Sequence, residues 1–269
     1  MRDRIAALVV CLLVTASVHS AEVWREPTTG MEFVRMDKGC FVMGVASNAF
    51  AAYDMDLHER AKTEMPSHEV CLDAFWIGRF EVKQAEWNRL LKGAVEPFPT
   101  DERPMAGIGW REAVDFANRL TEASAGKYRF RLPSEAEWEY ACRAGANPSD
   151  RPPSTDALDP KAWYSSSYQA PFSGVRIHSL QPVGRKAANA WGLHDMLGNV
   201  WEWTRDAYLA DGYRKHPLYN PVIEGPGDRR VIRGGGLRTG ARMVRCEGRA
   251  WLTMDDSMDT VGFRLVREE

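Results

Sequence analysis

The chain of 269 residues lacks several features that would assign it to a familiar class of protein. No charge of one sign predominates: 35 Lys and Arg stand against 37 Asp and Glu, a formal net charge of −2. Because no positive field exists to attract phosphate, this balance argues against a general nucleic-acid-binding protein. A composition of 44% apolar and 27% charged residues also excludes a disordered polymer, a collagen-like repeat and a multi-span membrane protein.

Motifs that mark well-known enzyme classes are missing as well. No Walker, Rossmann or nucleophile-elbow motif occurs, so neither nucleotide binding nor acyl transfer is indicated. No cysteine lies in a CxxC or CxH arrangement, which argues against structural zinc. The histidines beyond the N-terminal region have no HxxxH or HxxE spacing and give no support for a non-haem iron centre: His58, His68, His178, His194 and His216.

The N-terminal residues are typical of a targeting segment. Arg2 and Arg4 precede an apolar run from Ile5 to about Val18, and Ser20 is a small residue just before Ala21. This pattern predicts a cleaved signal peptide over residues 1–20 and a periplasmic or secreted mature protein. The alternative is an uncleaved N-terminal anchor, although the run is short for a span of roughly 20 residues.

Export changes the meaning of the cysteines. Removal of the signal peptide takes Cys11 with it and leaves an even number in an oxidising compartment, which favours two disulfides. Spacing alone leaves all three pairings open, and four buried thiols are the alternative. The remaining cysteines are Cys40, Cys71, Cys142 and Cys246.

The mature chain, residues 21–269, has no linker and no repeat and is predicted to form one domain. Helical spacing predicts a helix over Trp110–Ala123. Ser134 and Glu137 form a capping box that predicts another helix, with Gly145 placed to end it. Strands are expected within 32–43, 68–82, 191–206 and 231–266, a short helix over 83–92, and an irregular loop over 146–182. Strands, helices and strands in this order predict an α+β domain.

Four motifs, in this order, resemble one family. RLPSEAEWEYACRAG (131–145), WGLHDMLGNVWEWTRD (191–206), RVIRGGG (230–236) and GFRLV (262–266) are similar to the sulfatase-modifying-factor, or formylglycine-generating-enzyme-like, domain. The resemblance covers nearly all of the mature chain. It implies a single α+β domain that is related to the C-type lectin fold and is low in regular secondary structure.

The best-known members of this family convert a sulfatase cysteine into formylglycine with oxygen and copper. They use two cysteines, since Cu(I) is soft and prefers sulfur ligands. In this chain Thr239 stands at the first position, residues 241–244 hold no cysteine for the second, and Gly236 replaces a serine. The resemblance therefore implies a branch that lacks the catalytic cysteines, and we expect no copper site.

The resemblance also implies structural features. Cys142 and Cys246 match positions that a disulfide joins in family members, which leaves Cys40 and Cys71 as the second pair. The family holds calcium at positions that match Asp195, Gly198, Val200 and Glu202, and such mixed carboxylate and carbonyl ligands suit this ion. The alternative is that these carboxylates only hydrogen-bond the turn. A second calcium site is expected to be absent, because no acidic residue lies near Val175.

An arginine-rich stretch over residues 228–249 is a candidate anion-binding groove, because guanidinium groups match carboxylates and phosphates. Arg238 and Arg242 would contact the ligand, with Trp201 and Trp251 as walls. The alternative is structural ion pairing, which fits Arg245, Arg249 and Arg264 best. Glu247, among these arginines, is either a general base or an ion-pair partner.

We therefore expect an exported accessory or maturation factor that acts on a periplasmic protein or a small metabolite, which is anionic if the groove binds it. Any oxidative step would not use the two-cysteine copper mechanism, and whether the chain is an enzyme stays open. One alternative is a non-catalytic, lectin-like module that binds a ligand or a protein. Another is a formylglycine-generating oxidase with relocated cysteines.

Overall fold

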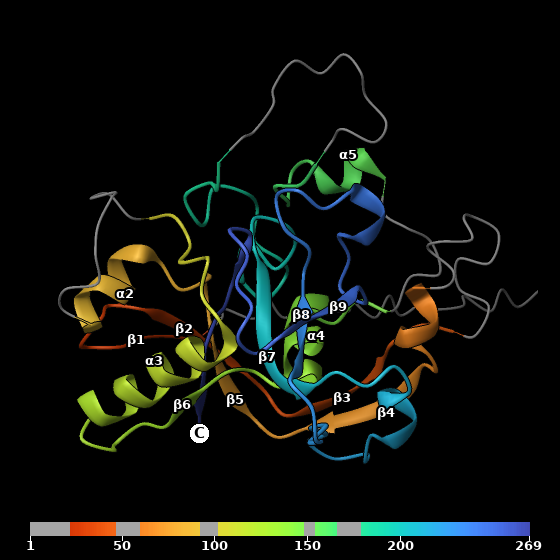
Figure 1. Cartoon of the computed structure of the whole chain (residues 1–269), viewed down its shortest axis with the longest axis horizontal. Helices are drawn as coiled ribbons and strands as arrows, with labels where there is room; N and C mark the ends of the chain where they lie inside the picture. Colours follow the sequence, from red (N-terminus) through yellow and green to blue (C-terminus); the bar gives the residue numbers. More distant parts are fainter. Residues whose placement is uncertain (1–21, 47–59, 92–101, 148–153, 166–178) are drawn as a thin grey trace, which may run out of the picture.

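The computed structural model describes residues 22–46, 60–91, 102–147, 154–165 and 179–269 (Figure 1). The predicted signal peptide, Cys11, His58, His178 and the position near Val175 lie outside these residues. The strands are β1 Val23–Arg25, β2 Glu32–Met36, β3 Gly39–Met43, β4 His68–Leu72, β5 Phe75–Gly78, β6 Phe130–Arg131, β7 Trp201–Ala207, β8 Arg229–Arg233, β9 Arg249–Thr253, β10 Val261–Gly262 and β11 Val266–Glu268. The helices are α2 Gln84–Leu91, α3 Trp110–Ala123, α4 Glu135–Arg143 and α5 Thr155–Leu158, with 3-10 turns η1 Lys62–Glu64, η3 Gly212–Lys215 and η4 Ala241–Met243.

The strands in the described part of the chain form three sheets. A five-stranded sheet has the order β1-β2-β5-β11-β6, so the C-terminal strand lies between strands from the first half of the sequence. A four-stranded sheet has the order β10-β7-β8-β9, in which β10 runs parallel to β7. Strands β3 and β4 form a hairpin-like pair of their own. Both larger sheets therefore depend on pairing between distant segments.

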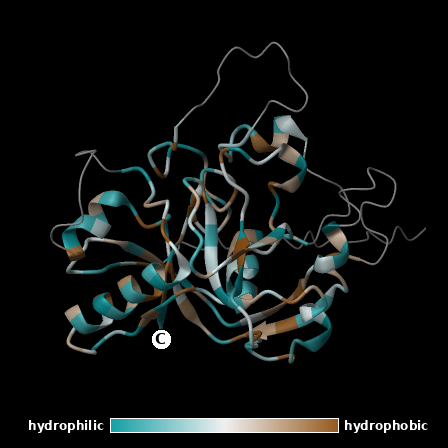
Figure 2. Cartoon of the chain, viewed as in Figure 1, coloured by the Kyte–Doolittle hydropathy of each residue, from teal (hydrophilic) through white to brown (hydrophobic). Residues whose placement is uncertain are grey.

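Helix α3 begins and ends at the predicted residues. Its apolar side, with Ala113, Phe116, Ala117 and Leu120, is buried. Phe116 stacks on Trp87 of α2 with ring centroids 5.0 Å apart. The visible side of α3 is largely hydrophilic in Figure 2, as expected for an amphipathic helix that covers the sheets on one side.

Helix α4 confirms the predicted capping box. The Glu137 N–H donates to the Ser134 hydroxyl at 3.1 Å, and the Ser134 N–H donates to the Glu137 carboxylate at 2.7 Å. The helix ends at Ala144, whose φ of 47° is left-handed, and Gly145 follows with a φ of 85°. The buried side of α4 packs against β7 and β8 on the face opposite α3 (Figure 1).

Two disulfides are present, and both match the predicted pairs. Cys40 and Cys71 are register partners in β3 and β4, and their bond joins the two strands. Cys142 in α4 is bonded to Cys246, which follows η4. In the residues that the structure describes, no helix combines the length and the apolar composition needed to cross a membrane.

Candidate functional site

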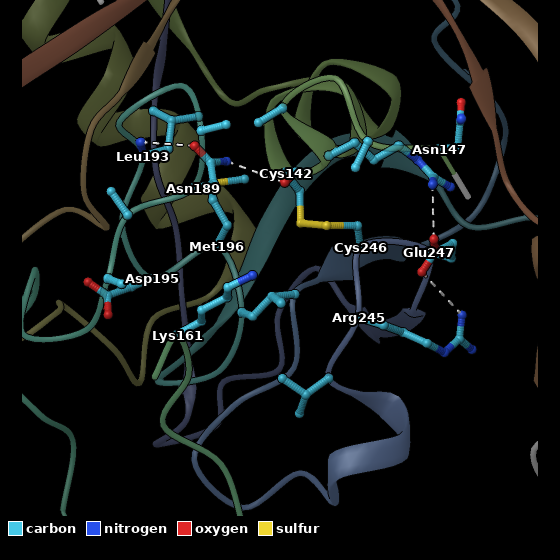
Figure 3. A pocket seen from close by; sticks show the side chains of 18 residues that line it. Cys142, Asn147, Lys161, Asn189, Leu193, Asp195, Met196, Arg245, Cys246 and Glu247 are labelled. Atoms are coloured by element: carbon cyan, nitrogen blue, oxygen red, sulfur yellow. Dashed lines mark hydrogen bonds and ion pairs between the residues drawn. A yellow bond between two sulfur atoms is a disulfide. The ribbon is translucent and has the colours of Figure 1, made fainter. Parts of the chain in front are cut away.

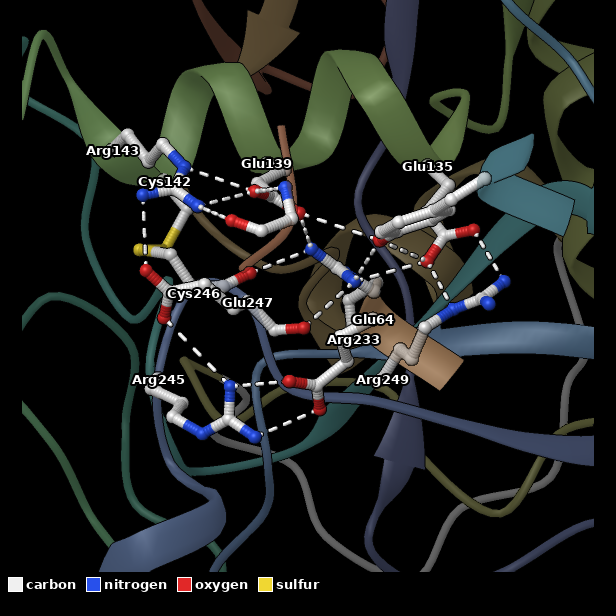
Figure 4. A network of polar contacts seen from close by, with 12 residues as sticks. Glu64, Glu135, Glu139, Cys142, Arg143, Arg233, Arg245, Cys246, Glu247 and Arg249 are labelled. Atoms are coloured by element: carbon white, nitrogen blue, oxygen red, sulfur yellow. Dashed lines mark hydrogen bonds and ion pairs between the residues drawn. A yellow bond between two sulfur atoms is a disulfide. The ribbon is translucent and has the colours of Figure 1, made fainter. Parts of the chain in front are cut away.

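The centre of the arginine-rich stretch is a buried ion-pair network between α4 and the four-stranded sheet (Figure 4). Arg233 and Arg249 are directly paired on β8 and β9, so both side chains lie on the face that α4 covers. Glu135 and Glu139 are one helical turn apart and meet them. Arg249 binds Glu135 through two contacts of 2.7 and 2.8 Å, and Arg233 reaches Glu139 at 2.5 Å.

The opposite charges in this network stabilise one another. Burial by itself raises the pKa of Glu139, but the positive charges of Arg143 and Arg233 outweigh this effect and lower it to about 2. Arg245 makes two contacts of 2.7 and 2.8 Å with Glu64, which is fully buried beneath it. The guanidinium groups of Arg245 and Arg249 are thus engaged with buried carboxylates and connect distant parts of the fold. The structural alternative is therefore correct for Arg245 and Arg249.

Glu247 lies at the edge of the same network. Its side chain is buried, and Oε1 lies 3.0 Å from Nη1 of Arg143. Oε2 lies 4.0 Å from Nη1 of Arg245, so the carboxylate sits between two guanidinium groups (Figure 4). A general base needs a lone pair directed at a substrate. The arrangement instead favours the ion-pair interpretation of Glu247.

A cavity of about 410 Å³ lies beside the Cys142–Cys246 disulfide. Figure 3 shows the disulfide and Glu247 on one side of this cavity, with Lys161 and Asp195 on the other. Its remaining walls come largely from small and aliphatic residues of the segments that flank α4 and η4. The space suits a small molecule in size, but its charged residues on the disulfide side are already engaged with one another.

Arg238 is exposed and already paired. Its guanidinium makes two contacts of 3.1 and 2.7 Å with Asp259, and the two side chains are 69% and 64% exposed. Arg242 belongs to η4, where its carbonyl accepts a hydrogen bond from Nε of Arg245 at 3.2 Å. Arg238 thus lies in the exposed segment that follows β8. To bind another polar group, its guanidinium must share or release Asp259.

Trp201 and Trp251 do not wall a common groove, which corrects the prediction. Trp203 pairs with Ile232, which pairs with Ala250, so these three residues share one face of the four-stranded sheet. Trp201, two residues before Trp203, lies on the same face. Trp251 follows Ala250 directly and therefore lies on the opposite face. Alternation along the strands separates the two rings.

The segment where the resemblance places the family's catalytic residues forms a tight turn. The Gly236 N–H donates to the Thr239 hydroxyl at 2.9 Å. A Cβ atom on Gly236 would lie 3.1 Å from Cδ1 of Trp201 and 3.1 Å from the carbonyl oxygen of Thr260. Glycine thus lets the backbone pack against the Trp201 ring. In the described residues all four cysteines are in disulfides, so no thiol is available at this turn.

The predicted calcium ligands lie in a buried acidic cluster. Asp195 accepts the Gly184 N–H through Oδ2 at 2.6 Å, whereas its buried Oδ1 has no hydrogen-bond partner. Glu81, also buried, has a pKa raised well above its usual value by burial and by the charges of Asp195 and Glu202. Three buried acidic side chains, Glu81, Asp195 and Glu202, lie together with one guanidinium group, that of Arg264.

The predicted calcium ligands differ in how many free oxygen lone pairs they could offer to a cation. Glu202 already accepts three hydrogen bonds, two from Arg264 at 2.6 and 2.7 Å and one from Trp138 at 2.7 Å. A carboxylate has about four lone-pair sites, so little of Glu202 is left for a metal. This pairing also confirms the structural interpretation of Arg264. Gly198 is required by the turn, because a Cβ there would lie 2.2 Å from the Trp163 carbonyl oxygen, and Val200 lies buried beside it.

Asp195 is consequently the side chain with a free buried oxygen. In the described part of the chain, no group of three or more His, Cys, Asp or Glu side chains is arranged to hold a metal ion. The excess of acidic over basic side chains and the unpartnered Asp195 oxygen nevertheless suit a divalent cation, with backbone oxygens completing its ligands.

Sequence reasoning missed Glu64, Glu135 and Glu139 as the partners of the arginines. Their positions in the sequence offered no sign of contact with residues that lie between 94 and 181 positions away. It also missed Trp110 and Arg205, which line a second cavity between α3 and β7.

Comparison with known proteins assigns the chain to one family. The family described as "Sulfatase-modifying factor enzyme 1-like domain" matches residues 19–269. The chain is 31% identical over 221 residues to the formylglycine-generating enzyme of Mus musculus, a match that covers 79% of this chain and 56% of the mouse protein. It is 29% identical over 264 residues to hercynine oxygenase of Mycolicibacterium thermoresistibile, covering 78% of this chain and 53% of that protein. The chain spans little more than half the length of these relatives.

Among solved structures, PvdO from Pseudomonas aeruginosa has a TM-score of 0.76 at 25% identity, covering 93% of this chain and 98% of that one. The match extends over almost the whole of both chains. It confirms the predicted fold class, a single α+β domain with modest regular secondary structure that is consistent with a C-type lectin-like fold.

Proposed function

Because the chain belongs to the sulfatase-modifying factor family, we propose that it is an exported accessory or maturation factor that acts on a periplasmic protein or a small metabolite. Relatives in this family include proteins named for oxidation chemistry, such as hercynine oxygenase. The match to PvdO over nearly the full length of both chains shows that the two share this domain fold.

One observation carries the proposal: the four cysteines of the described residues are all consumed by two disulfides. A Cu(I) site of the family's kind needs two thiolates, because sulfur is the ligand that this ion prefers. At the turn where they would lie, Gly236 and Thr239 hydrogen-bond each other. The chain would therefore act on its client without the two-cysteine copper mechanism.

The client would meet the segment after β8, next to Trp201. Arg238 and Asp259 are exposed there and offer a charge of each sign to a polar partner. Trp201 supplies an aromatic surface beside Gly236. The two disulfides also support export, since such bonds persist mainly in oxidising compartments.

Calcium is proposed as a structural ion of this domain, held by Asp195 with the backbone of Gly198 and Val200 and a minor share from Glu202. When bound, it would neutralise the acidic cluster beneath the turn that leads into β7. The unpartnered Asp195 oxygen and the excess of acidic over basic side chains in the cluster support this proposal.

A non-catalytic ligand-binding module is the second candidate, favoured by an aromatic platform on the other face of the sheet. Trp251 is 37% exposed, the guanidinium of Arg229 lies 3.8 Å from its ring centroid, and the Tyr208 ring lies 6.0 Å away. Exposed aromatic rings beside one another can bind cationic or flat ligands.

Two measurements test the proposal. Incubation with a Cys-x-Pro-x-Arg peptide, oxygen and copper should leave the peptide mass unchanged, and an aldehyde product would restore the formylglycine-generating activity instead. Oxygen uptake that depends on a client, and that falls in Trp201→Ala but not in Trp251→Ala, would support a maturation enzyme. The opposite pattern, with ligand binding lost only in Trp251→Ala, would support the binding module.

A further inference from the structure

A second cavity, of about 440 Å³, lies between α3 and the far end of β7. Trp110, Val114 and Ala117 of α3 form one wall, and residues 222–225 form another. Arg205 and Arg230 line it from β7 and β8. Trp201 and Arg205 are four residues apart on an extended strand, about 13 Å. The cavity is thus separate from the turn at Gly236.

Basic side chains outnumber acidic side chains around this cavity. It is lined by four arginines and a single acidic residue, Glu224, which is exposed. The other two arginines, Arg129 and Arg131, pair with carboxylates outside the cavity. In the part of the chain that the structure describes, neither Arg205 nor Arg230 forms an ion pair with a carboxylate. Arg205 and Arg230 therefore line this space, and within the described residues neither has a carboxylate at ion-pair distance.

The guanidinium group of Arg230 is held in place, but not all of its N–H groups have a hydrogen-bond partner. Its guanidinium lies 4.8 Å from the ring centroid of Trp110. Nη1 donates to the carbonyls of Gly227 and Arg229 at 3.2 Å each, while the buried Nε has no partner. Burial, followed by repulsion from Arg111, lowers the pKa of Arg230. An anion beside this group would relieve both effects.

The nearest buried acid does not supply that anion. Both oxygens of Asp206 accept backbone N–H groups, from Glu135 and Ile223, at 2.8 Å each. Burial, followed by repulsion from Glu135, raises the pKa of Asp206 to about 7, so its negative charge is only partial near neutral pH. Asp206 therefore bonds the backbone and makes no direct ion pair with either arginine.

We propose that this cavity binds a small organic anion, with a flat apolar body on Trp110 and its carboxylate, sulfate or phosphate group between Arg205 and Arg230. The apolar wall of α3 residues and Phe130 accepts the body of such a molecule. Guanidinium groups recognise planar oxyanions through paired hydrogen bonds. The volume falls in the range of small-molecule sites rather than of protein interfaces.

The test uses 2-naphthoate as the probe and its neutral analogue 2-naphthamide as the matched control, in calorimetric titrations of the intact mature protein. The naphthoate should bind at least about tenfold more tightly than the amide, since hydrogen bonds to charged groups are strong. Arg205→Met and Arg230→Met should each weaken naphthoate binding about tenfold or more and leave amide binding unchanged. Arg119→Met, which removes an exposed arginine of α3 paired with Asp115 at 2.7 Å, should change neither.

Arg205→Met removes no ion pair and is expected to fold. It keeps the proposal testable if Arg230→Met, which loses the contact with Trp110, destabilises the protein. Circular dichroism checks that both variants are folded. Three results would overturn the proposal: no naphthoate binding at millimolar concentration, equal binding of the amide, or unchanged binding in both variants. None of these readouts involves a client or oxygen, so this site stands or fails separately from the proposed function.

Discussion

Arg249 in β9 and Glu135 in α4 form a two-contact ion pair, with distances of 2.7 and 2.8 Å, and neither side chain is exposed. The pair connects the edge strand of the four-stranded sheet to the helix on its buried face. Arg249 also donates to the carbonyl oxygen of Thr63 at 2.7 Å, which ties η1 to the same point. Breaking this pair therefore leaves a charge that water cannot reach.

Arg249→Met tests this consequence. The substitution leaves Glu135 with one guanidinium fewer in a buried site, and removal of one partner of a buried pair typically costs about 3–5 kcal/mol. Urea unfolding should show a loss of that size in the free energy of unfolding. Arg238→Met, which removes an exposed pair, should cost about 0–1 kcal/mol. Equal losses in the two variants would contradict the assigned roles.

The two disulfides should differ in their contribution to stability. Cys142 and Cys246 are separated by 104 positions, and Cys40 and Cys71 by 31. In the chain-entropy account, closing these loops stabilises the fold by about 4.8 and about 3.7 kcal/mol. We expect the Cys142→Ser/Cys246→Ser double variant to unfold at a lower urea concentration than the Cys40→Ser/Cys71→Ser double variant. The reverse order would show that local packing at β3 and β4 outweighs loop length.

Glu86 in α2 should make stability fall as the pH rises. Burial raises its pKa from 4.5 to about 7, although a hydrogen bond from the Lys83 N–H opposes this. The folded state thus holds a proton that the unfolded state releases, and this contribution is complete below about 4.5 and lost as the pH rises to about 7.

Glu86→Gln keeps an oxygen for the Lys83 N–H and cannot ionise. Between pH 5 and pH 7, the variant should lose less unfolding free energy than the wild type, by up to about 1.4 kcal/mol per pH unit. Urea unfolding at each pH measures this difference, and other titrating groups cancel in the comparison. Parallel pH profiles would show that Glu86 ionises normally in the folded protein.

Removal of calcium tests the acidic cluster. After chelation, addition of millimolar calcium should raise the melting temperature, because an ion bound only to the folded state stabilises it by mass action, by about 2.7 kcal/mol at a hundredfold excess over its Kd. Asp195→Asn keeps a residue type that tolerates the left-handed φ of 53° and removes the charge, so the shift should shrink. Sodium chloride at equal ionic strength is the control. Absence of any calcium-specific shift would contradict the proposed site.

The sequence by itself determined the local elements. The bounds of α3 follow from apolar residues at three- and four-residue steps, and the start of α4 follows from Ser134 and Glu137. These signals are contained within a few neighbouring residues, so no distant contact is needed to interpret them. The motifs that resemble the family likewise predicted the fold class and the disulfide pairs.

Only the tertiary structure decided which side chains meet. Trp201 and Trp251 looked like two walls of one groove, but strand alternation places them on opposite faces of the sheet. Whether an arginine binds a ligand or stabilises the core depends on carboxylates far away in the sequence: Arg249 finds Glu135 across 114 positions, whereas Arg205 finds no carboxylate in the described residues. The charge balance at a site depends on which side chains are neighbours in space. Packing decides which charges are buried and paired, and residue type and spacing in the sequence do not show this.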